Sequence, residues 1–334
     1  MSGLFAGVSP RGRALFAVMI AFLLAAPLFL NDYWLTVIVL CCYYAYTGQS
    51  WNLMLGFAGL LSVGHALFIG VGAYTSAALF VHFGLPPALG IFAAVLVAVV
   101  AGGIVGALGF RFVIRGVYFA LLTIAFAEFV RILVDHSGWL GGTAGLFLPV
   151  KNREGIDLLN LRGSPLMFYY IIVFLNFAAL ALCRWLLAGR FGYYWQAIRD
   201  DQDAAQALGI NVFRYKMAAV AISCGMAGVA GVFYAFYYNN LFPEQIFAVA
   251  ESVQVTFAPI VGGVGTLFGP ILGAFILTPL GRVLSTLTEH WNLPGIQLLF
   301  WGLCVAAIVL FRPAGIWPWI ARSLGLTVRP GKDQ

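Results

Sequence analysis

The sequence has few charged residues. Aspartate, glutamate, lysine and arginine together make up 9% of its 334 residues, whereas hydrophobic residues make up 62%. The mean hydropathy of +0.96 lies far outside the range of soluble domains, whose surfaces need much more charge. The composition therefore excludes an ordinary soluble domain and indicates a polytopic membrane protein.

Lysine is scarce, and this bears on how the protein could be energised. The chain has three lysines, and none stands in the phosphate-loop pattern GxxxxGK[ST]. If ATP drives this protein, another chain binds the nucleotide. Ion-driven carriers usually keep several ionisable groups inside their spans. Here only Glu128 lies well inside an apolar run, with Glu251 and Arg282 nearer the ends of others.

Residue patterns for catalysis or metal binding are also missing. The four histidines are scattered without an HExxH pattern, no GxSxG sequence occurs, and the five cysteines lie in apolar runs without CxxC spacing. We interpret the cysteines as small packing residues. We expect no enzymatic activity, no metal site and no cofactor in this chain.

Long apolar runs dominate what is present. A helix that crosses about 30 Å of hydrocarbon needs about 20 residues. The candidates are 14–30, 33–55, 57–82, 87–109, 117–135, 166–187, 214–238, 250–263, 267–288 and 295–311. The runs are continuous, whereas the strands of a membrane β-barrel would alternate. We predict an all-α protein with about 8–10 transmembrane helices, forming one transmembrane domain over residues 1–334.

Two of these runs differ from an ordinary membrane-spanning helix. The run 250–263 is too short to span alone, and Pro259 with Gly262 and Gly263 suggests a broken or re-entrant helix. The run 14–30 follows basic residues and could imitate a secretory signal. Because many spans follow it, we interpret it as the first membrane helix and keep a signal peptide as the alternative.

The basic residues predict the orientation of the chain. If both termini are cytoplasmic, thirteen of the eighteen basic residues lie inside, as the positive-inside rule favours. This orientation places the loop 136–165 outside and the loop 188–213 in the cytoplasm. The net charge of +6 then reflects membrane orientation and not nucleic-acid binding.

The cytoplasmic loop contains a polar segment, AIRDDQDAAQALGINVFRYK, at residues 197–216. Residues 194–208 contain no glycine or proline, and Gly209 is a natural helix stop, so we predict one helix of about fourteen residues. Its apolar stripe is formed by Trp195, Ile198, Ala205 and Leu208. Short helices with such a stripe dock into grooves on partner proteins. A solvated loop or a helix on the membrane surface are the alternatives, although three aspartates disfavour contact with anionic lipid.

Within this loop, DAAQALG (203–209) resembles the EAA…G loop of ABC importer permeases, with aspartate in place of glutamate and without the later IxLP of that pattern. In that family the loop is a coupling helix that contacts the ATP-binding subunit. The resemblance implies that role for Arg199, Asp203, Ala204, Ala205 and Gly209.

Further segments resemble the branched-chain amino acid permeases of the LivM type. They are WNLMLGFAGLLSVGHA (51–66), GVGAY (70–74), RGVYFALLTIAFAE (115–128), GGTAGL (141–146), ALGIN (207–211) and GGVGTLFGP (262–270). The matches cover most of the chain from residue 51 to about 280.

This resemblance implies a set of partners and a location. We expect a permease subunit of an ABC importer for branched-chain or related hydrophobic amino acids, in the bacterial inner membrane. The expected partners are a second homologous permease, two cytoplasmic ATP-binding subunits that carry ATP and Mg²⁺, and an extracytoplasmic solute-binding protein. A urea or amide permease is the alternative within the class, and an ion-coupled secondary transporter is the alternative outside it.

Two glycine-rich segments, VGHALFIGVGAY (63–74) and VGTLFGPILGAF (264–275), align without gaps and suggest an internal duplication. Broken helices are tolerated at membrane depth where they line a cavity or are covered by protein. Close helix packing is the alternative explanation of the glycines. We predict that the following residues border the transport path near the middle of the membrane: Asn52, Ser62, Gly64, His65, Gly263 and Gly265. We expect Glu128 and Arg131, three residues apart, to form a structural ion pair.

Overall fold

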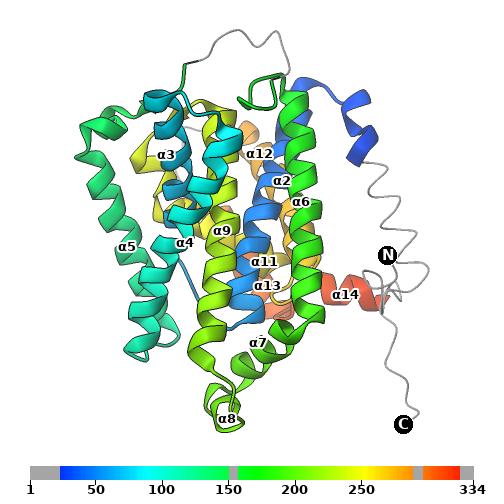
Figure 1. Cartoon of the computed structure of the whole chain (residues 1–334). Coiled ribbons are helices and arrows are strands. Elements are labelled where there is room, and N and C mark those ends of the chain that lie inside the picture. Colours follow the sequence, from blue (N-terminus) through cyan, green and yellow to red (C-terminus); the bar gives the residue numbers. More distant parts are fainter. Residues whose placement is uncertain (1–22, 150–156, 289–295, 324–334) are drawn as a thin grey trace.

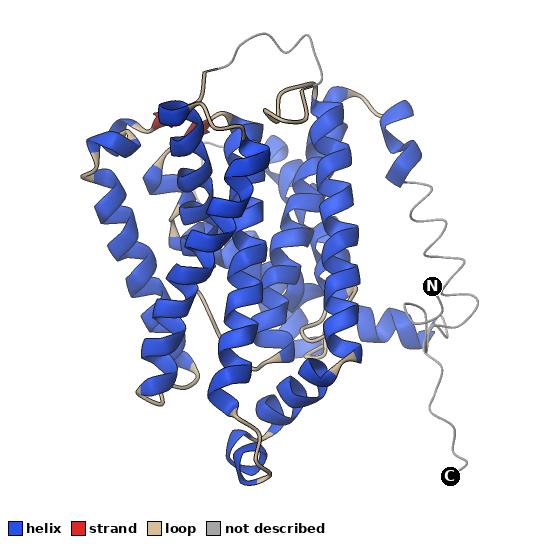
Figure 2. Cartoon of the chain, viewed as in Figure 1, coloured by secondary structure: helices blue, strands red, loops and turns tan. Residues whose placement is uncertain are grey.

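The computed structural model describes residues 23–149, 157–288 and 296–323. Within these ranges the chain is almost entirely helical, with one short pair of strands (Figure 2). This confirms the prediction of an all-α fold. Most of the predicted first span, 14–30, falls outside the described residues.

Six helices of the described residues are long and apolar enough to cross a membrane. They are α3 (His65–Phe83), α4 (Pro87–Arg111), α5 (Val117–Asp135), α6 (Pro165–Ala188), α9 (Val212–Tyr238) and the run Pro243–Gly262, which joins α10 (Pro243–Ile246) to α11 (Val249–Gly262). Beside them lie α2 (Asp32–Asn52), α12 (Gly269–Thr288) and α13 (Ile296–Phe311) (Figure 1).

The remaining elements are short. They are η1 (Ala26–Leu28), the short π-helix η2 (Leu53–Phe57), η3 (Gly138–Leu140), η4 (Gly142–Ala144), β1 (Leu146–Phe147), α7 (Arg190–Asp200), α8 (Gln202–Ala207), β2 (Asn240–Leu241) and α14 (Ile316–Ser323). The strands β1 and β2 pair antiparallel, with Leu146 opposite Leu241.

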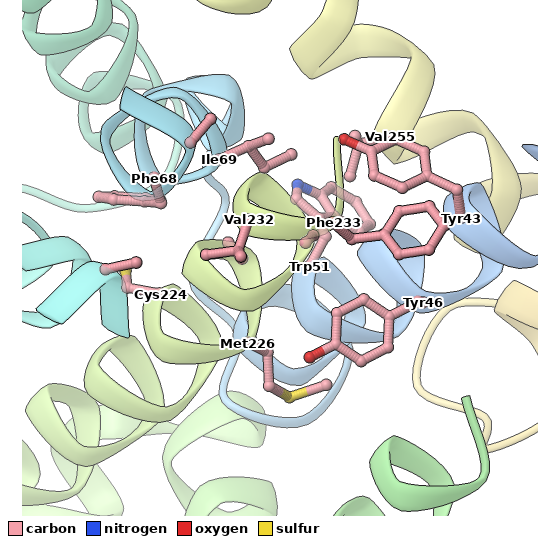
Figure 3. Close-up of a cluster of buried hydrophobic side chains, with 14 of the residues drawn as sticks. Tyr43, Tyr46, Trp51, Phe68, Ile69, Cys224, Met226, Val232, Phe233 and Val255 are labelled. Carbon is pink, nitrogen blue, oxygen red and sulfur yellow. The ribbon is translucent and has the colours of Figure 1, made fainter. Parts of the chain in front are cut away.

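Helix α9 lies at the centre of the bundle. It packs against α2, α3 and α4, and 78% of its most apolar stretch is buried, compared with 28% in α4 and in α5. The latter two helices therefore lie at the periphery, where apolar side chains can face lipid. In the core, Tyr43 of α2 stacks on Phe233 of α9 with 6.2 Å between ring centres, and Trp51 of α2 and Phe68 of α3 belong to the same cluster (Figure 3).

The predicted span 57–82 is broken in the structure. Helix α2 ends in η2, residues 60–64 are not helical, and α3 begins at His65. The first amides at this break find partners on distant helices. The hydroxyl of Thr123 accepts hydrogen bonds from the amides of Val63 and Gly64, and the hydroxyl of Ser252 accepts one from Ala66. The break is therefore covered by protein, as a buried helix end requires.

The break predicted from Pro259, Gly262 and Gly263 lies at the two glycines. Helix α11 continues through Pro259, and the chain leaves the helix only after Gly262, where Gly263 has a φ of 129°. The loop then runs to α12 at Gly269. Glycine is required at this exit because a residue with a side chain rarely adopts such a φ.

The two loops singled out in the sequence lie at opposite ends of the bundle (Figure 1). Helices α7 and α8 lie at one end, which we call the α7–α8 end. The pair β1–β2, in the loop after α5, lies at the other. This is the arrangement that the charge distribution predicted for 136–165 and 188–213.

Candidate functional site

The predicted single helix 194–208 is wrong, because the structure divides this segment into α7 and α8. Asp201 interrupts the helix with an extended backbone (φ −153°, ψ 108°), and its carboxylate accepts hydrogen bonds from the amides of Asp203 and Ala204. Asp201 is thus the N-cap of α8. An aspartate that caps the following turn is more stable outside the helix than within it.

The apolar stripe of this segment is largely as predicted. Trp195, Ile198 and Ala205 are buried, and the indole Nε1 of Trp195 donates to the carbonyl of Tyr215 at 2.8 Å. These contacts fasten α7 and α8 to α9. Leu208 is the exception, since it is 83% exposed and does not join the stripe.

The end of α8 has the geometry that Gly209 suggested. Gly209 has a φ of 85°, and the amide of Ile210 donates to the carbonyl of Ala205 at 3.1 Å. This is a Schellman motif, in which a left-handed glycine closes the helix. Nothing lies within 4 Å of the position that a Cβ atom of Gly209 would occupy, so the backbone and not crowding requires glycine here.

Asp203 forms the outer contact of α8. Its carboxylate meets the guanidinium of Arg115 in two hydrogen bonds of 3.0 and 3.2 Å, and this guanidinium holds the pKa of the Asp203 carboxyl below its usual value. Both side chains are about half exposed or more, so the pair adds little stability. It does tie α8 to the loop that precedes α5. Ala204 is exposed beside it.

The side chain of Arg199 extends from α7 to the end of α2. Its Nη1 donates to the carbonyl of Gly56 in η2 at 2.5 Å, and its side chain also lies against Gly59 and Gly265. A charged donor on a carbonyl is among the stronger hydrogen bonds. Arg199 therefore connects α7 to the end of α2 and to the loop between α11 and α12.

Asn52 completes this connection. Its Oδ1 accepts from the amide of Gly265 at 2.8 Å, and its Nδ2 donates to the carbonyl of Thr266 at 2.9 Å. The sequence suggested that Asn52 and Gly265 border a path and that Arg199 serves coupling. The structure brings the three into one contact region, which we call the junction.

Ser62 and His65 lie elsewhere, deeper in the bundle. His65 is fully buried, and its Nε2 lies 2.9 Å from the hydroxyl of Ser50, which donates in turn to the carbonyl of Ser223. The backbone carbonyl of Ser62 accepts from the indole of Trp51 at 2.6 Å. These polar groups join α2, α3 and α9. Ser50 and Ser223 could not be recognised in the sequence, because their partners lie on other helices.

Gly64 and Gly263 are packing positions in the structure. A Cβ atom on Gly64 would lie 2.1 Å from the carbonyl oxygen of Thr123, and Gly263 faces the backbone of Ala314 and Gly315. Gly64 and Gly265 therefore have different surroundings, and their place along the transport path stays a prediction. Gly64 lies beside the polar groups of His65, whereas Gly265 belongs to the junction.

Two adjoining hollows lie beside α7 and α8 at the α7–α8 end. Their volumes are about 580 and 190 Å³, and Arg115, Gln202 and Lys216 border both. The Nζ of Lys216 donates to Oε1 of Gln202 and lies 5.6 Å from the ring centre of Phe110. Helix α8 thus projects from the bundle beside two adjoining hollows, as a docking element would.

The expected ion pair of α5 is confirmed. Nε of Arg131 lies 2.5 Å from Glu128, and Nη1 lies 2.8 Å from Asp135, a third member that we did not anticipate. Among the described residues, no group of three histidine, cysteine or acidic side chains could hold a metal ion.

Comparison with known proteins agrees with this architecture. The family model described as the permease component of branched-chain amino acid transport systems matches residues 33–311. The high-affinity branched-chain amino acid permease protein LivM of Escherichia coli is 27% identical, covering 96% of this chain and 78% of its own. LivM of Salmonella typhimurium is 29% identical, covering 87% and 71%.

A more distant relative has another printed function. The autoinducer 2 import system permease protein LsrC of Photorhabdus laumondii is 28% identical over 59% of this chain and 58% of its own. No solved structure matches. Because the family model spans residues 33–311, the chain belongs to the family of permease components of branched-chain amino acid transport systems.

Proposed function

We propose that this chain is the permease subunit of an ATP-driven importer for branched-chain or related hydrophobic amino acids in the bacterial inner membrane. It forms part of the translocation path, and ATP and Mg²⁺ bind to partner subunits. The family match supports the permease role, and the LivM relatives support the substrate class. The partners are a second permease, two ATP-binding subunits and an external binding protein.

The observation that carries the coupling role is the junction. A subunit that moves α7 and α8 would move Arg199, whose guanidinium contacts Gly56 at the end of α2. Asn52 then links α2 to the loop before α12. Coupling needs packed elements that move together, and this series of contacts joins the projecting helices to two spans.

The alternative functions differ from this proposal in the substrate or in the energy source. A urea or amide permease would use the same junction but a different substrate, and the LsrC relatives show that other solutes occur among similar permeases. An ion-coupled carrier would transport without ATP-binding partners. Uptake of leucine that depends on ATP and on those partners would exclude the carrier.

Arg199 provides the test of coupling. In the complete reconstituted complex, Arg199→Gln removes the contact with Gly56. We expect leucine uptake per ATP hydrolysed to fall about tenfold, because this ratio corresponds to the free energy of one hydrogen bond from a charged donor. Arg190→Gln is the matched control, because Arg190 is an exposed arginine at the start of the same helix. Equal uptake per ATP in wild type and both variants would refute the coupling role of the junction.

A further inference from the structure

A carboxylate stands without a partner in the half of the bundle opposite α7 and α8. Glu251 is the third residue of α11, which follows β2 and α10 at that end. Its Oε1 is buried and accepts no hydrogen bond within the described residues. An ionisable group inside a span is costly unless something compensates it, and such groups mark substrate or ion sites.

Tyrosines of α2 and α9 lie beside this part of α11. The hydroxyl of Tyr44 donates to Oε1 of Gln254, three residues after Glu251, at 2.7 Å, and Tyr44 packs in a series of rings with Tyr43, Tyr234 and Tyr238. The ring centres lie 5.4 Å apart for Tyr43 and Tyr44, 6.0 Å for Tyr43 and Tyr234, and 4.6 Å for Tyr234 and Tyr238. Aromatic rings beside a carboxylate make a suitable environment for an ammonium group.

The exposure and orientation of the tyrosine rings favour a route for a ligand from the surface of the bundle to its core. Tyr238 is 41% exposed, whereas Tyr43 is 3% exposed, so the tyrosines extend from the surface to the core. Figure 3 shows the Tyr43 hydroxyl directed toward Val255, one turn beyond Glu251 on α11. That hydroxyl is buried and also lacks a hydrogen-bond partner among the described residues.

An arginine lies on a neighbouring helix. Helix α12 packs against both α2 and α11, and it returns from the loop after α11, so Arg282 in its later half lies toward the same end of the bundle as Glu251 at the start of α11. Within the described part of the chain, Arg282 forms no ion pair, with Glu251 or with any other acid. A carboxylate and a guanidinium thus stand on neighbouring helices without forming an ion pair with each other.

We propose that Glu251, Arg282 and these tyrosines form a recognition site for a zwitterionic α-amino acid on its way through the membrane. Glu251 receives the ammonium group, with the tyrosine rings around it, and Arg282 receives the carboxylate, for which its planar fork of donors is suited. This inference rests on the proposed function, because it names the groups by which this permease contacts an amino acid.

Competition binding tests the assignment of each charge. The probe is labelled leucine, bound to the complete complex in nanodiscs without the binding protein. The competitors are isopentylamine, which lacks the carboxylate, and 4-methyl-2-oxopentanoate, which lacks the ammonium group. Wild type should bind leucine at least about tenfold better than either analogue, because each loses one charged contact.

Glu251→Gln and Arg282→Gln should each lose the preference for leucine over a different analogue. Glu251→Gln should bind leucine and the oxo acid about equally, and Arg282→Gln should bind leucine and the amine about equally. Glu128→Gln is the control, because it also removes a carboxylate from a span but one paired with Arg131, and it should keep the wild-type preference. A merely structural role of Glu251 or Arg282 would not produce these opposite changes in preference.

Unchanged preferences in both variants, with leucine uptake by the wild type intact, would overturn the recognition site and leave the proposed function standing. Failure of the wild-type complex to take up leucine would instead reject the proposed function. The two failures are therefore distinguishable in one set of preparations.

Discussion

Gly64 is closely packed and Gly103 is not, so replacing each of them with alanine tests whether close packing requires glycine. A Cβ atom on Gly64 would lie 2.1 Å from the Thr123 carbonyl, whereas nothing lies within 4 Å of one on Gly103 in α4. Gly64→Ala should therefore destabilise the protein by about 1–3 kcal/mol, because the backbone of α5 must move. Gly103→Ala should be neutral or slightly stabilising, because alanine favours the helix. Thermal unfolding of both variants in detergent measures the difference, and equal melting temperatures would contradict the packing role.

Single residues were predictable where their role is local. The stop at Gly209 follows from a glycine after an uninterrupted helical stretch, and its φ of 85° confirms it. Thr123 and Ser252 were not predictable, because the amides that they satisfy lie 59 and 186 residues away along the chain. Asn52 was recognised as a polar residue in a span, but its partners in the loop before α12 could not be deduced from spacing.

At the scale of elements, the division between α7 and α8 gives a direct test. Asp201→Ala removes the N-cap of α8 and should destabilise this short helix by about 1 kcal/mol. Hydrogen exchange of the peptide spanning 202–208 should accelerate about fivefold in the complete complex, as that free energy implies. Asp200→Ala is the matched control, because the Asp200 side chain is exposed and pairs with Arg199 at 3.5 Å without capping α8. Equal exchange in the two variants would show that the cap does not hold α8.

The long elements were predicted from length and hydropathy, but the break before α3 and the division between α7 and α8 were not. The bounds of α4, α5 and α6 agree with the apolar runs 87–109, 117–135 and 166–187 to within two residues. The run 57–82 gave no sign that residues 60–64 leave the helix, because hydropathy does not register where a backbone finds its hydrogen bonds. Helix propensity likewise joined α7 to α8, since it does not weigh the capping contact that Asp201 gains by leaving the helix.

At the scale of the whole molecule, the proposed coupling depends on orientation. The loop after α5 and the helices α7 and α8 lie at opposite ends of the bundle, and the charge distribution predicts that the α7–α8 end is cytoplasmic. ATP-binding subunits can reach α7 and α8 only in that orientation. The site at Glu251 and Arg282 would then lie in the outer half, where an arriving amino acid is met before it reaches the junction.

Two exposed leucines can establish this orientation. Leu158 in the loop after α5 is 63% exposed, and Leu208 after α8 is 83% exposed, so a cysteine at either position should react with a thiol reagent once the reagent reaches it. An impermeant reagent added to intact spheroplasts should label Leu158→Cys, whereas Leu208→Cys should be labelled only after lysis. Wild type is the control, because its own cysteines are buried or half-buried and should react little. The reverse pattern would place α7 and α8 outside the cell, beyond the reach of any ATP-binding subunit, and the coupling role of Arg199 would fail with it.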